Sequence, residues 1–144
     1  MSLLLGAAPT RTSGWRGVLR PAGVVVAVTA GVALVAGVDP NEAGHYPTCP
    51  FLAVTGLYCP GCGTLRAVHD LAHGDVLGAL ARNPLAVAAV GVALAAVAFW
   101  FRRAWLGVPR THDLPPRVLY AAVVVIVGFT LLRNVPGWTW LSPA

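Results

Sequence analysis

The chain has 144 residues, of which 57% are hydrophobic and 10% are charged. A soluble domain carries about 25% charged residues, because polar side chains must cover much of its surface. The composition therefore argues against a soluble enzyme and indicates a single membrane domain over residues 1–144. The net charge of +5 comes from arginines at the ends of apolar runs and not from a basic patch. We therefore expect no nucleic-acid partner.

Three apolar runs predict three transmembrane helices, over about residues 21–38, 84–101 and 117–135. The apolar cores of these runs are slightly shorter than a hydrocarbon layer of about 30 Å. Arginines that extend to the interface, or a locally thinner bilayer, would cover that deficit. The five tryptophans lie near the ends of the runs, as expected for an interfacial aromatic belt. The predicted fold class is all-α, with the lipid bilayer as a partner.

The distribution of arginines predicts the orientation of these spans. Arginines are in excess before the first span and after the second, whereas the long loop 39–83 holds more acids than arginines. The positive-inside rule then places the N-terminus in the cytoplasm and the loop outside it. The lysine-free composition suggests a bacterial protein, and hence the inner membrane. The first span could be a cleavable signal peptide, but its length favours a retained anchor.

The loop 39–83 is rich in proline and glycine in its first half, which predicts turns rather than regular structure. A short amphipathic helix is predicted from Thr64, as its N-cap, to Gly74. Asp75 can cap a second short helix, and Asn83 can cap the span that follows. We expect the short helices to lie along the outer membrane surface.

All three cysteines lie in this loop. Cys59 and Cys62 form a Cys-Pro-Gly-Cys turn, and Cys49 lies upstream in a second Cys-Pro pair. A turn that points both sulfurs to one side is typical of a metal-binding knuckle. Tetrahedral zinc needs four ligands, so His45 or His69 would supply the fourth. A structural disulfide between Cys59 and Cys62, or a redox-active thiol pair, remains an alternative.

Four charged residues are further candidates for polar contacts. Arg66 and Asp70 are spaced for an ion pair on one helix face, and Asp75 follows on the same side of the membrane. This face is either solvated or turned toward a ligand or a partner helix. Arg133 ends the third span, and the favoured interpretation is that it extends to the outer interface. If it faced inward, Asp70 or Asp75 would be its partner.

The loop and the start of the second span resemble a bacterial family of small membrane proteins, known as domain of unknown function 2752. The matching positions are Cys49-Pro50, Thr55-Gly56, Cys59 to Gly63, Arg66-Ala67, Gly74-Asp75 and Asn83-Pro84-Leu85. The chain departs from the family pattern where Thr64-Leu65 stands in place of Leu-Thr. The resemblance implies a multi-span membrane protein and supplies no activity.

We expect a binding or accessory module rather than an enzyme, with its loop closed by Cys49, Cys59 and Cys62 through zinc or a disulfide. The sequence contains no Ser-His-Asp set, phosphate-binding glycine loop or paired catalytic carboxylates. Its partner would be another membrane protein or a second copy of the chain. The alternative function is a membrane thiol–disulfide oxidoreductase, in which Cys59 and Cys62 exchange and Cys49 resolves the mixed disulfide.

Overall fold

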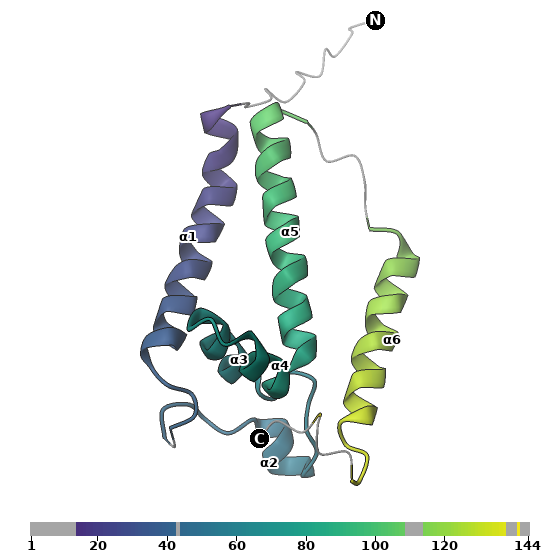
Figure 1. Ribbon diagram of the computed structural model, residues 1–144. Coiled ribbons are helices and arrows are strands. Elements are labelled where there is room, and N and C mark those ends of the chain that lie inside the picture. The colour runs from purple at the N-terminus through teal and green to yellow at the C-terminus, as the bar shows by residue number, and fades with distance from the viewer. Residues whose placement is uncertain (1–13, 43, 109–113, 138–140, 142–144) are drawn as a thin grey trace, which may run out of the picture.

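The computed structural model describes residues 14–42, 44–108, 114–137 and 141, which form six helices and no strand (Figure 1). The prediction of an all-α fold is confirmed over these residues. The longer helices are α1 (Trp15–Gly37), α5 (Pro84–Leu106) and α6 (Pro116–Leu132). The short helices are α2 (Pro50–Thr55), α3 (Thr64–Ala72) and α4 (Val76–Arg82). Figure 1 shows the short helices gathered at one end of the longer ones.

Two helices of the described residues are long and apolar enough to cross a membrane. These are α1 and α5, each with 23 residues. Both extend beyond their predicted spans, α1 at its start and α5 at its end, so neither has the predicted length deficit. The third apolar helix, α6, has 17 residues and would reach about 26 Å. That is shorter than the hydrocarbon layer, so a third span stays a prediction.

The two long helices run antiparallel and pack against each other. Where α1 begins and α5 ends, the backbone N–H of Gly14 donates to the carbonyl of Trp105 at 3.1 Å. At the opposite end α3 packs on α1, α4 and α5. Figure 1 shows α6 on the other side of α5 from α1. Its C-terminal end is bonded to the loop that carries the cysteines.

A small core lies where α3, α4 and α5 meet, and not between the long helices. Its buried residues are Ala67, Ala79 and Ala86, with Leu71 and Val87 packed against them. Alanine side chains allow helix backbones to approach closely. Among the described residues, this buried core is therefore formed by the loop 39–83 together with the start of α5.

The capping predictions are partly confirmed. Asp75 caps α4, because its carboxylate accepts from the N–H of Gly78 at 2.8 Å. Thr64 was predicted as an N-cap but is the first helical residue, and Gly63 takes the cap position with a φ of 80°. Only glycine adopts that conformation without strain, which places the cap one residue earlier.

The prediction that the first half of the loop lacks regular structure is wrong at α2. Pro50 begins this helix at the position where a fixed φ favours helix formation. The Thr55 hydroxyl donates to the carbonyl of Phe51 at 2.6 Å and secures the last turn. The helix has six residues, too few to show the periodicity from which a helix is recognised.

Asn83 connects the cysteine turn to the start of α5. Its side chain is fully buried, and its Oδ1 accepts from the N–H of Ala86 at 3.0 Å, which confirms it as a cap. Its Nδ2 donates to the carbonyls of Pro60 and Cys62 at 2.9 and 3.1 Å. One buried side chain thus satisfies a helix end and two carbonyls of the turn.

Replacing Asn83 with alanine should lower the free energy of unfolding by about 2–4 kcal/mol, because buried polar groups lose their partners. Asn83→Asp keeps the cap acceptor but removes the donor, so it should also destabilise the chain. Denaturant unfolding in detergent micelles measures the change. Asn41→Ala, at an exposed position, is the control. An N83D variant as stable as the wild type would show that the contacts to the turn contribute nothing.

Candidate metal centre

The structure brings the three thiols together. The Sγ atom of Cys59 lies 3.1 Å from that of Cys62 and 3.5 Å from that of Cys49, and all three Sγ atoms lie within 4.8 Å of one another. These separations exceed a disulfide bond of about 2.05 Å, and each cysteine is free. Thiolates on one tetrahedral zinc, at about 2.3 Å each, stand about 3.8 Å apart. The cluster therefore has the spacing that suits a single metal ion.

Local backbone geometry sets this arrangement. Cys49 directly precedes α2, while Cys59 and Cys62 close a turn in which the N–H of Cys62 donates to the carbonyl of Cys59 at 3.2 Å. The N–H of Thr64 then donates to the carbonyl of Gly61 at 3.0 Å. The chain enters α3 immediately after this turn, so the two sulfurs of the turn meet the sulfur at the start of α2.

Arg133, directly after α6, binds the turn that contains Cys59 and Cys62. Its Nη1 donates to the carbonyl of Cys59 at 2.8 Å, and Nη1 and Nη2 both donate to the carbonyl of Cys62 at 3.3 Å. The side chain is 2% exposed and lies over the rings of Tyr58 and Phe129. The interpretation that Arg133 extends to an interface is therefore wrong. A guanidinium fork can bind two carbonyls at once, and the turn provides them.

The expected carboxylate partners of Arg133 are also wrong. No carboxylate of the described residues forms an ion pair with it, and its Nε is buried without a hydrogen-bond partner. Instead, the ionisable groups whose negative charge would stabilise it are the thiols of Cys62 and Cys59 and the phenol of Tyr58. A buried cation requires a nearby counter-charge. The charge on Arg133 is therefore a reason to expect an anionic cluster at the cysteines.

Asn134 adds a second connection between the end of α6 and the loop. The N–H of Tyr58 donates to its Oδ1, and its Nδ2 donates to the carbonyl of Tyr58, both at 2.8 Å. Sequence reasoning missed this contact and the contacts of Asn83 to the turn. The available signal was a pair of polar residues, Arg133 and Asn134, directly after an apolar run.

The environments of the thiols differ. Backbone N–H groups at the start of α2, that of Leu52 first, lower the pKa of Cys49, and the neighbouring thiol of Cys59 adds to this effect. Burial, reinforced by Cys59, raises the pKa of Cys62 to about 12. In the metal-free chain, Cys49 is therefore the thiol that ionises more readily and Cys62 stays protonated near neutral pH.

The two histidines expected as fourth ligands lie outside the group of thiols that could hold a metal. The Nδ1 of His45 is 3.1 Å from the carbonyl of Asp39 and 3.4 Å from the Glu42 carboxylate. His69 lies between Asp39 and Asp70, with nitrogen–oxygen distances of 3.9 and 3.6 Å. The identity of a fourth ligand stays a prediction.

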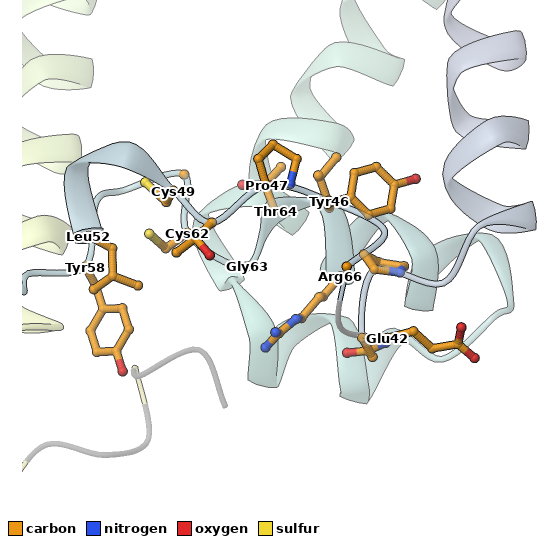
Figure 2. Close-up of a pocket in the computed structure, with 16 residues that line it drawn as sticks. Glu42, Tyr46, Pro47, Cys49, Leu52, Tyr58, Cys62, Gly63, Thr64 and Arg66 are labelled. Atoms are coloured by element: carbon orange, nitrogen blue, oxygen red, sulfur yellow. The ribbon is translucent and has the colours of Figure 1, made fainter. Parts of the chain in front are cut away.

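The other predicted polar residues have separate places. Asp70 pairs with Arg82 at 3.7 Å, Asp75 is used as a cap, and Arg66 lines a cavity of about 650 Å³. This cavity lies between the segment 40–49 and the first turn of α3. Figure 2 shows Cys49 and Cys62 toward one end of the cavity and Glu42 at the other, with the Arg66 side chain between them. The thiol cluster is thus accessible from one side.

The thiol environments predict the order of alkylation of the metal-free chain. With chelator present, Cys49 should react with iodoacetamide at lower pH than Cys62, because only the thiolate is nucleophilic and the pKa of Cys49 is lowered. The reaction of Cys62 should rise only at strongly alkaline pH. Peptide mass spectrometry after short pulses between pH 6 and about 10 measures this order. Equal rates, or Cys62 reacting first, would contradict the arrangement.

Comparison with known proteins agrees with the cysteine signature. No curated protein and no solved structure matches the chain. Residues 49–97 match the model of a family described as "Protein of unknown function (DUF2752)", which confirms the resemblance drawn from the sequence. The match begins at Cys49 and covers the other two cysteines, α3, α4 and more than half of α5. Over these residues, about a third of the chain, the sequence is similar to the DUF2752 family of proteins of unknown function.

Proposed function

We propose that this protein is a small membrane module whose loop binds one thiophilic metal ion, with zinc as the foremost candidate. The observation that carries the proposal is the group of three free thiols, Cys49, Cys59 and Cys62, whose Sγ atoms lie within 4.8 Å of one another. Thiolate ligands select zinc, monovalent copper or iron–sulfur clusters over hard cations such as magnesium. Zinc suits a site with no redox requirement.

The charge of the site supports a divalent metal. Three thiolates around one divalent ion leave a single negative charge, which the buried guanidinium of Arg133 would balance. Burial raises the pKa of Cys62, so a metal that binds there would displace the proton of this thiol. Without the metal, the chain buries a cation beside thiols of which Cys62 remains protonated.

The metal would have a structural role and not a catalytic one. The ligands join the start of α2 to the turn before α3, and the carbonyls of that turn are bound by Asn83 and Arg133. A metal at the thiols would thereby fix the ends of α5 and α6 through their contacts to the loop. We infer an accessory or binding role toward another membrane protein or a second copy. The excess of arginines before the first predicted span and after the second supports an extracytoplasmic loop 39–83 and a cytoplasmic N-terminus.

The full chain, purified in detergent without added chelator, should contain about one zinc per chain by elemental analysis. Replacing any one of Cys49, Cys59 or Cys62 with serine should remove most of it, because a hydroxyl is a poor ligand for zinc in such a site. His73→Ala, an exposed histidine outside the thiol group, is the matched control. Retention of zinc in the three cysteine variants would contradict the proposal.

A thiol count distinguishes the structural metal site from the oxidoreductase or disulfide alternative. Denaturation without reductant but with chelator, followed by alkylation, should modify all three cysteines, because a metal-bound thiolate becomes free on unfolding. A structural disulfide would leave one cysteine open to alkylation. Turnover of a dithiol substrate by the wild type would favour the oxidoreductase.

Arg133 should support the metal site without binding the metal itself. Arg133→Gln removes the buried charge and part of the hold on the turn, so the dissociation constant for zinc should rise about 10–100-fold, as for other residues that orient ligands. Competition against a chromophoric chelator measures it. Arg102→Gln, at an exposed position in α5, should leave the constant unchanged. Equal zinc affinity in R133Q and wild type would remove Arg133 from the site.

A further inference from the structure

We propose that the fourth coordination position of the metal is filled from the cavity, by a small external thiol, and not by the chain itself. This inference rests on the metal site proposed above. It gives that site a ligand-binding role. A closed metal site only stabilises a fold, whereas a site with an open coordination position can take up and release a ligand.

The first step concerns the donors that the chain offers. In the described part of the chain, the only group of three or more residues placed to hold a metal is Cys49, Cys59 and Cys62. All cysteines of the sequence are therefore used, and neither His45 nor His69 belongs to this group. His45 contacts Asp39 and Glu42. His69 lies 3.9 and 3.6 Å from the carboxylates of Asp39 and Asp70, and its Nδ1 is buried without a hydrogen-bond partner. Zinc with three protein ligands keeps its fourth position for water or an exchangeable ligand.

The second step concerns access to the cluster. Cys49 and Cys62 line the cavity, and Tyr46, Pro47 and Arg66 also contribute to its lining. Its volume is about 650 Å³, within the range of small-molecule sites at about 300–1,000 Å³. One water occupies about 30 Å³, so the space is far larger than a water ligand needs. The cavity therefore has room for a small organic ligand beside the metal position.

The third step concerns the chemistry of that ligand. A metal held by three thiolates accepts a further sulfur donor readily, because soft ligands favour the same ions. Arg133 balances the charge of a divalent ion with three thiolates, so binding another thiolate leaves the site with one net negative charge. The lining of the cavity also carries Glu42 and Arg66, which suits a thiol that also bears charged groups.

The binding step is a ligand exchange without oxidation or reduction. The external thiol loses its proton to solvent, its sulfur forms a bond to the metal, and the bond from the metal to water breaks. The oxidation states of the metal and of all sulfurs stay unchanged. The step therefore needs no oxidant or electron acceptor.

Cobalt substitution tests the inference. The full chain in detergent, purified with a phosphine reductant and loaded with Co²⁺, should show sulfur-to-cobalt charge-transfer absorption. Adding 2-mercaptoethanol should raise that absorption saturably by about one third, as the thiolate ligands increase from three to four. Ethylene glycol, which has a hydroxyl in place of the thiol, should leave it unchanged.

The outcomes separate the two proposals. If Co²⁺ produces no charge-transfer band, the metal site itself is wrong. If the band is present but does not respond to 2-mercaptoethanol, or declines as the metal is removed, only the external ligand is wrong. A weaker visible spectrum in His45→Ala or His69→Ala, before any thiol is added, would place the fourth ligand in the chain and overturn the inference.

Variants of the cavity locate the response. Thr48 is exposed and lines the cavity, so Thr48→Trp should reduce the response to 2-mercaptoethanol severalfold while Co²⁺ still binds. Val54→Trp, on α2 and 86% exposed, adds the same side chain outside the cavity and should respond like the wild type. An unchanged response in T48W would exclude the cavity as the route. The wild-type titration decides the inference even if T48W does not fold.

Discussion

One carbonyl oxygen, that of Cys62, is the point at which three parts of this chain meet. It accepts from Asn83 at the start of α5 and from both terminal nitrogens of Arg133 at the end of α6. Both side chains are buried, so neither can exchange this acceptor for water at low cost. The position of the cysteine turn, and with it the distance between the sulfurs, depends on these contacts.

This polar junction matters because the long helices contribute little burial of their own. Apolar side chains along α1, α5 and α6 are largely exposed within the chain, and in a bilayer lipid covers them without a hydrophobic gain from helix association. The packed core is a group of alanines beside the loop. The fold is therefore organised from one end, where hydrogen bonds and close backbone contacts are concentrated.

Sequence reasoning succeeded where the cause of a structure is local. Asp75 and Asn83 are recognisable as caps because each acts on the residues that directly follow it, and the apolar runs reveal the long helices by composition. It failed for Arg133, whose bond to the Cys59 carbonyl crosses 74 residues. No spacing rule connects positions so far apart. The cavity depends on the same long-range packing, whereas α2 was missed because six residues are too few to show a helical period.

The 74-residue separation between Arg133 and its acceptor also has a consequence for the order of biosynthesis. A ribosome makes the chain from its N-terminus, so all three cysteines emerge before α6 exists. During that interval the carbonyls of the turn lack the guanidinium, and the thiols can meet solutes or oxidants without it. The turn gains its contacts from Arg133 only when α6 and the residues directly after it have been synthesised and docked against the loop.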